Sequence, residues 1–346
     1  MNNLRTLVRT GVTIVIIALL GWYTWKQTIA QPQYTIGLVY CPSFPFHESI
    51  NTTLIQKLKA DGRFKIQTFA VPTVNDMVIV NSIGGSALES TADAIVSTGI
   101  SCSQAVTQLS RKRNSLKPIV FVGVSDPVSC GIISSLENPG ENITGISSSL
   151  PYDDNFNAAN LLMVVKPNTR HVLLPYIATD NESMAKNIKT TLASYSVATT
   201  LLPVNNETEA LMRITGKLLG HDTLMYLEDD GLAAQGPAMG KLASQHNVTM
   251  FAGSIDGVEN AALSYVANPA SLGNHAFDLI KQVFLDRKNR STIPVQYAVI
   301  KRNLIINTAL CKEQGLKDIK LSLTPILAHI RSDERFALMH DNIIVK

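Results

Sequence analysis

The sequence predicts an α/β protein made of two Rossmann-like lobes with parallel sheets and a ligand cleft at a hinge. Three observations support this fold class. Short strands alternate with helical segments over residues 34–124, and the same order returns over residues 171–252. The strands are near-continuous runs rich in Val and Ile, typical of strands buried on both faces. With 346 residues, 45% of them hydrophobic, the chain is long enough for two cores.

In the first half, apolar runs of strand length are separated by longer helical segments. The expected strands are 34–40, 64–69, 94–97 and 118–124, and the expected helices are 49–58, 76–89 and 102–110. Asp126 and Pro127 follow the fourth strand. An Asp before a Pro fits a helix N-cap with Pro at the first helical position, so a further helix is expected there.

The second half repeats the same order of elements. The expected strands are 171–176, 199–203, 223–227 and 249–252, and the expected helices are 183–194, 207–219 and 236–246. The halves join near residues 147–151. Paired α/β halves place a ligand between them, outside the carboxyl ends of the strands.

The sequence lacks the motifs of several other function classes. There is no Ser-His-Asp order, no clustered metal ligands and no glycine-rich phosphate loop after a strand. The histidines have no nucleophile motif beside them, which disfavours a hydrolase or transferase. The net charge of +3 comes without a basic run interleaved with aromatic residues, which disfavours nucleic acid. We therefore expect a binding protein with no enzyme activity, no cofactor and no metal.

The N-terminus has a composition of its own. Arg5 and Arg9 precede an uncharged apolar segment, residues 10–25. This order is typical of an export signal, and residues 28–30 offer small side chains for cleavage. The Trp and Tyr residues near the end of the segment would equally suit a retained membrane anchor. Residues 1–30 are therefore a signal peptide or an anchor, and the rest of the chain is exported.

Four cysteines follow in a compartment expected to be oxidising: Cys41, Cys102, Cys130 and Cys311. Four cysteines allow three complete pairings, and their spacing does not select one. The spacing is also not that of a zinc site. Buried free thiols are an equal alternative to disulfides.

Residues 118–128 (PIVFVGVSDPV) and 136–147 (LENPGENITGIS) closely resemble the signature of a family of exported ABC transporter substrate-binding proteins. This group includes tryptophan- and tyrosine-binding receptors. Weaker matches follow in the right order at 182–183, 251–258, 272–273, 293–295 and 304–307. The resemblance covers about residues 34–316.

The resemblance implies the type I periplasmic-binding-protein architecture, in which the chain crosses between the lobes three times. Lobe 1 would hold residues 31–147 and 269–287, and lobe 2 residues 148–265 and 292–320. Residues 321–346 would form a C-terminal extension that packs as a short amphipathic addition or contacts a partner. The two lobes would close on the ligand by a hinge motion.

Family members that bind amino acids hold the ammonium group with carboxylates and the carboxylate with hydroxyls and backbone amides. Carried over to this sequence, the candidate solute-binding residues at strand ends are Tyr40, Ser43, Ser97, Thr98, Ser125, Asp126, Tyr176, Glu182, Ser183, Asp229, Ser254 and Asp256. Helix capping remains an alternative for Ser97, Thr98 and Asp126. For Asp229, a solvated turn is the alternative.

The function implied is that of a monomeric extracytoplasmic receptor, periplasmic or tethered to the inner membrane by residues 10–25. It would deliver a small polar solute, an amino acid or related compound, to an ABC permease. A membrane-anchored ligand sensor is the alternative. Two departures from the family pattern weaken the case for an aromatic amino acid. Residues 41–46 are rich in Pro and aromatics, and residues 268–271 replace a frequent Tyr-Tyr pair.

Overall fold

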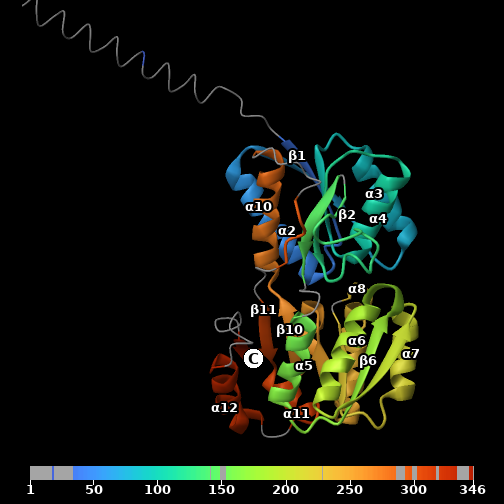
Figure 1. The fold of residues 1–346 in the computed structure, drawn as a ribbon, viewed down its shortest axis with the longest axis vertical. Coiled ribbons are helices and arrows are strands. Elements are labelled where there is room, and N and C mark those ends of the chain that lie inside the picture. The colour runs from blue at the N-terminus through green and yellow to red at the C-terminus, as the bar shows by residue number, and fades with distance from the viewer. Residues whose placement is uncertain are drawn as a thin grey trace, which may run out of the picture.

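The computed structural model describes Ala18 and residues 34–140, 142–148, 153–227, 229–285, 293–297, 302–316, 319–332 and 343–345. Its two lobes follow one another along the longest axis (Figure 1). Within these residues, no helix is long and apolar enough to cross a membrane. Apart from Ala18, the predicted signal peptide or anchor lies outside the described part of the chain.

Lobe 1 is built on a parallel sheet with the strand order β2-β1-β3-β4-β5. The strands are β1 (Tyr34–Tyr40), β2 (Phe64–Ala70), β3 (Ala94–Thr98), β4 (Ile119–Val124) and β5 (Ile143–Ser147). The helices are α2 (Pro45–Asp61), α3 (Met77–Glu89), α4 (Ile100–Lys112) and α10 (Pro269–Phe284). Side chains of β1 alternate between two apolar clusters: Ile36 and Leu38 pack with α2 and α10, and Val39 packs with α3 and α4.

Lobe 2 is built on a sheet with the strand order β12-β11-β10-β9-β8-β6-β7, in which the β10–β11 ladder is antiparallel. The strands are β6 (His171–Ile177), β7 (Ala198–Val204), β8 (Thr223–Tyr226), β9 (Thr249–Ala252), β10 (Leu263–Ala267), β11 (Arg302–Ile306) and β12 (Ile343–Val345). The helices are α5 (Asp153–Val165), α6 (Ala178–Ser194), α7 (Glu207–Lys217), α8 (Asp230–Ala234), α9 (Gly236–His246), the 3-10 helix η1 (Ile255–Asn260), α11 (Thr308–Glu313) and α12 (Ile319–Ser332).

Helices of lobe 2 also cover both faces of its sheet. Leu174 of β6 packs in a cluster with α5, α6 and α12, whereas Leu173 packs with α7, α8 and α9 on the other face. Side-chain caps begin α7, α8 and α11. Asn206 Oδ1 accepts a hydrogen bond from Glu209 N at 2.9 Å and so begins α7 directly after β7.

The elements predicted for 34–124 and 171–252 are present, and the strand bounds agree within one residue. Helix α6 begins five residues earlier than predicted, directly after β6. The helix expected after Asp126 was wrong, because residues 127–131 form turns. Asp126 caps this turn, accepting hydrogen bonds from Ser129 N at 3.0 Å and Ser129 Oγ at 2.7 Å. Gly131, with φ 68°, takes a left-handed conformation that ends helical winding.

The chain returns to lobe 1 after β10. Helix α10 crosses α2 so closely that a Cβ on Gly273 would lie 2.6 Å from Ile50 O. Residues 293–296 then run beside β5: Gln296 N donates to Gly145 O at 3.0 Å, and Ser147 N donates to Gln296 O at 3.0 Å. The sequence-based boundary that assigns residues 292–320 to lobe 2 therefore needs correction, because residues 293–296 pack on the sheet of lobe 1.

The C-terminal extension packs onto lobe 2. Ile330 of α12 is fully buried in the cluster beneath α5 and α6. Strand β12 pairs with β11 and extends the sheet. Ile326 and Leu327 pack against the same cluster, and residues 333–342 lie outside the described part of the chain. All four cysteines are buried free thiols.

Candidate functional site

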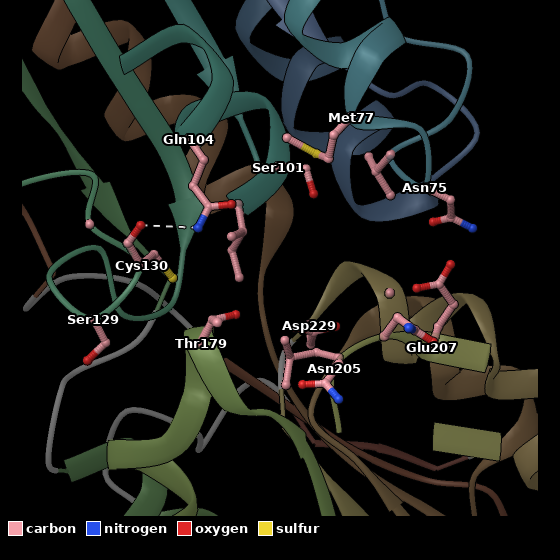
Figure 2. Close-up of a pocket in the computed structure, with 16 residues that line it drawn as sticks. Asn75, Met77, Ser101, Gln104, Ser129, Cys130, Thr179, Asn205, Glu207 and Asp229 are labelled. Atoms are coloured by element: carbon pink, nitrogen blue, oxygen red, sulfur yellow. Dashed lines mark hydrogen bonds between the residues drawn. The ribbon is translucent and has the colours of Figure 1, made fainter. Parts of the chain in front are cut away.

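A cleft of about 600 Å³ lies between the two lobes. Figure 2 shows its two walls, one from each lobe. It is lined by segments that follow the carboxyl ends of six parallel strands, three in each lobe, which is where paired α/β sheets place their ligands. The residues that line it are Val74, Asn75, Met77, Ile100, Ser101, Gln104, Ser129, Cys130, Gly131, Ile177, Thr179, Asn205, Asn206, Glu207, Asp229 and Gly231.

The lobe 1 wall is polar and carries no charged side chain among the described lining residues. Ser101 and Gln104 lie one turn apart at the start of α4, which directly follows β3. Gln104 Nε2 donates to Cys130 O at 3.1 Å, joining α4 to the turn after β4 (Figure 2). Asn75 and Met77 flank Asp76, whose carboxylate caps α3. The wall thus presents amide and hydroxyl groups beside the apolar side chains of Met77 and Ile100.

The lobe 2 wall carries two carboxylates. Asp229 is 4% exposed. Its Oδ1 accepts from Leu232 N at 2.9 Å, capping α8, and its Oδ2 accepts from Asn181 Nδ2 at 3.1 Å. Glu207 is half-buried in the first turn of α7. A Cβ built on Gly231 would lie 3.3 Å from Asp229 Oδ1 and 3.6 Å from Glu207 Oε2, so both carboxylates flank the same point.

Of the strand-end candidates, Asp229 lines the cleft, and its burial rules out the solvated turn. Ser97 and Thr98 are fully buried at the end of β3. Ser97 Oγ donates to Ser103 Oγ at 3.0 Å, and Thr98 Oγ1 accepts from Asn51 Nδ2 at 2.9 Å. These two hydroxyls therefore support the wall from behind.

The remaining lobe 1 candidates also lie away from the cleft lining. Ser125 is buried, and its carbonyl accepts from Ser147 Oγ at 3.1 Å. Asp126 caps its own turn. Tyr40 is buried at the end of β1. Burial raises the pKa of the Tyr40 phenol, and the neighbouring Glu48 carboxylate raises it further. Ser43 is exposed, with its Oγ 3.0 Å from Cys41 Sγ.

In lobe 2, Tyr176 is buried in the core, and Ser254 is buried after β9. Ser183 is exposed on α6. Glu182 is exposed on the same helix, and its Oε1 lies 2.8 Å from Lys186 Nζ. The backbone of Asp256 belongs to η1, and its side chain lies outside the described part of the structure.

Most of the lining lies one to seven residues beyond the strand ends. The last residues of the strands are enclosed by the sheet and its helices, whereas the loops and first turns that follow them face the other lobe. Ser101, Thr179 and Glu207 are such first-turn residues, and Gln104 lies one turn beyond Ser101 on α4. A usable signal was present in the sequence for two of these helices, because the capping residues Asp76 and Asn206 mark where α3 and α7 begin.

The family model described as "ABC transporter substrate binding protein" matches residues 86–321. The chain belongs to this family. A curated relative of this substrate-binding protein is the tyrosine-binding protein of Clostridioides difficile (strain R20291). It is 24% identical over 318 residues, which cover 89% of this chain and 88% of the relative.

Solved structures similar to this substrate-binding protein show the same fold. The ABC domain in complex with L-Trp from Streptococcus pneumoniae has a TM-score of 0.73 at 18% identity, covering 82% of this chain and 95% of that one. A ligand-free, open substrate binding protein with adhesive properties from Clostridium difficile has a TM-score of 0.62 at 20% identity, covering 90% and 99%. The two lobes thus have the type I periplasmic-binding-protein architecture.

Proposed function

We propose that this substrate-binding protein is the receptor of an ABC importer and binds a small polar solute between its lobes. The observation that carries the proposal is the cleft of about 600 Å³ at the carboxyl ends of six strands. A cleft of this size suits a single small molecule. Its walls come from both lobes, so hinge closure would bury the solute and strengthen its polar contacts.

An amino acid or related compound is the solute class we favour. The printed names of two similar proteins support it, since one is a tyrosine-binding protein and the other was solved with L-Trp. The carboxylates of Glu207 and Asp229 suit an ammonium group, and the amides and hydroxyls of the opposite wall suit the rest of a polar solute.

We further propose that the protein works outside the cytoplasm as a monomer and hands its solute to a membrane permease. The charged-then-apolar order of residues 1–30 supports export. Mass spectrometry of the mature N-terminus from its native host would separate a cleaved signal from a retained anchor. An N-terminus near residue 31 supports cleavage, and an intact Met1 supports the tether.

The solute-binding proposal is tested by native mass spectrometry and thermal unfolding of the purified full-length chain. We expect a co-purified small molecule, or a rise in unfolding temperature with at least one member of a panel of amino acids, amines, nucleosides and small peptides. At a hundredfold excess over Kd, binding stabilises the folded state by about 2.7 kcal/mol. A panel without any shift, together with no co-purified molecule, would contradict the proposal.

A further inference from the structure

We propose, building on the receptor function above, that the cleft selects a solute with a net positive charge on an aliphatic body, that is, an aliphatic amine or guanidine. Neither the family match nor the names of similar proteins indicates such a charge. The inference comes from the loops that build the cleft, from the side chains that face it, and from the chemistry of the opposite wall.

In six segments around the cleft, all the charged residues whose side chains the structure describes are acidic. These segments are residues 71–77, 99–104, 125–131, 178–182, 205–209 and 229–231. Their described charged residues are Asp76, Asp126, Glu182, Glu207, Glu209 and Asp229. The chain as a whole has 30 Lys and Arg against 27 Asp and Glu, so this one-sided distribution is local to the cleft. A cleft lined by one sign of charge concentrates ligands of the opposite sign.

Several of these carboxylates already serve the fold. Asp76 caps α3, and Asp126 caps the turn after β4. Glu182 pairs with Lys186 at 2.8 Å, and Glu209 pairs with Arg213 at 3.1 Å. The carboxylates at the start of α3, in the turn after β4 and on the exposed faces of α6 and α7 therefore each have a structural role.

Glu207 differs from these residues. Within the described part of the chain it has no salt-bridge partner, although Glu209, two residues further on, has one. Its side chain points from α7 into the gap between the lobes (Figure 2). Its Oε2 and Asp229 Oδ1 flank the space above Gly231, 3.6 and 3.3 Å from the position of an absent Cβ. An ammonium or guanidinium group entering this space would contact both carboxylates through charge-assisted hydrogen bonds.

The opposite wall defines the rest of the solute. Among the described lining residues there is no Lys, Arg or His and no aromatic ring. An anionic group would meet no cation on the cleft wall, and an aromatic side chain would find no ring to stack on. The apolar surface of Met77 and Ile100 suits methylene groups, and Gln104 and Ser101 suit a terminal polar group. The described wall therefore matches an aliphatic chain better than an aromatic zwitterion.

The test compares solutes that differ only in charge. Arginine and citrulline have the same length, but one ends in a cationic guanidinium and the other in a neutral urea. Calorimetric titration of the purified full-length chain should give at least tenfold tighter binding for arginine, or for its decarboxylated amine agmatine, than for citrulline. The cation affinity should fall as NaCl is raised, because the attraction is screened.

Variants assign the effect to the cleft. Glu207→Gln should weaken cation binding at least tenfold and narrow the difference in affinity between arginine and citrulline. The matched control is Glu182→Gln, an exposed carboxylate of α6 that pairs with Lys186 and does not line the cleft, which should change neither affinity. Thermal unfolding of both variants checks that they fold.

The charge preference and the receptor function can fail independently in these experiments. Citrulline binding as tightly as arginine, Glu207→Gln leaving the cation affinity intact, or no binding of any cationic probe would overturn the cationic ligand. If tyrosine, tryptophan or another neutral solute binds in its place, the receptor function stands and only the charge preference falls.

Discussion

Asn181 holds the carboxylate of Asp229 from behind: its Nδ2 donates to Asp229 Oδ2 at 3.1 Å, and Asn181 is fully buried. Asn181 belongs to α6, and Asp229 precedes α8, so this hydrogen bond joins two helices of lobe 2. Because Asp229 Oδ1 is held by Leu232 N, both oxygens have fixed positions. The carboxylate is thus oriented before a solute arrives.

We expect Asn181→Ala to lower solute affinity about tenfold, since a hydrogen bond to a charged group contributes about 1.5–3 kcal/mol. Calorimetric titration measures the change. Glu182→Gln is the matched control, because Glu182 is the next residue on α6 but is exposed and paired with Lys186. Equal affinities for Asn181→Ala and wild type would show that Asp229 needs no support from α6.

Gly231 keeps the space between the two carboxylates open. A methyl group there would lie 3.3 Å from Asp229 Oδ1. We expect Gly231→Ala to weaken solute binding by tenfold or more without lowering the unfolding temperature, since Ala favours helix. In the control Gly216→Ala, the methyl meets nothing within 4 Å on α7. That variant should keep the affinity and gain up to about 1 kcal/mol of stability.

Asp222 makes the stability of lobe 2 depend on acid pH. Burial raises the pKa of this carboxyl, but hydrogen bonds from Lys166 Nζ, Arg170 N and His171 N outweigh it, so the pKa lies below its ordinary value. The folded state therefore gains stability above the ordinary pKa of 3.8, and that gain is lost as the pH falls through the lowered pKa. Urea unfolding from pH 7 to well below pH 3.8 should show a larger loss of stability in wild type than in Asp222→Asn.

At neutral pH, Asp222→Asn should be less stable than wild type by about 3 kcal/mol, because it leaves the buried Lys166 without its charged partner. Burial already lowers the pKa of the Lys166 ammonium. Stability of the variant should therefore rise with pH as Lys166 loses its proton. Glu182→Gln, which breaks an exposed pair, serves as the reference and should change stability by under about 1 kcal/mol. Parallel pH profiles for Asp222→Asn and wild type would contradict this assignment.

Gly257 lies against the ring of Tyr226. A Cβ on Gly257 would be 1.6 Å from Tyr226 Oη and 2.8 Å from its Cζ. We expect Gly257→Ala to lower the free energy of unfolding by about 3 kcal/mol, as overpacking in a core does. Adding Tyr226→Phe removes the closer contact and should restore part of the loss. A double variant no more stable than the single one would place the strain elsewhere.

The strands were predictable because each is a short apolar run between polar loops. A strand buried on both faces is apolar at nearly every position, so its ends are easy to locate in the sequence. The cleft lining was harder to predict. Strand-end residues such as Thr98 and Ser125 have the chemistry of a binding site, yet the sheet and its helices enclose them. Residue type alone does not distinguish these enclosed residues from Ser101 or Glu207. Those two line the cleft because each lies in the first turn of a helix that faces the opposite lobe.

Contacts between segments that are far apart in the sequence were also hard to predict. The return of α10 to lobe 1 followed from the family resemblance and not from its amphipathic pattern, which fits either lobe. Residues 293–296 have no strand pattern, and Gln296 sits beside β5 through backbone hydrogen bonds that any sequence can make. Strand β12 has only three residues, too few for a periodic signal.

The three crossings between the lobes have a consequence for synthesis on the ribosome. One face of the lobe 1 sheet is covered by α10, which is translated only after β6 to β10 of the other lobe. Lobe 2 in turn waits for β11, α12 and β12, which are translated after α10. A nascent chain released before residue 269 would therefore expose apolar faces in both sheets at once. The two lobes must complete their folding together, once the residues of β12 have been made.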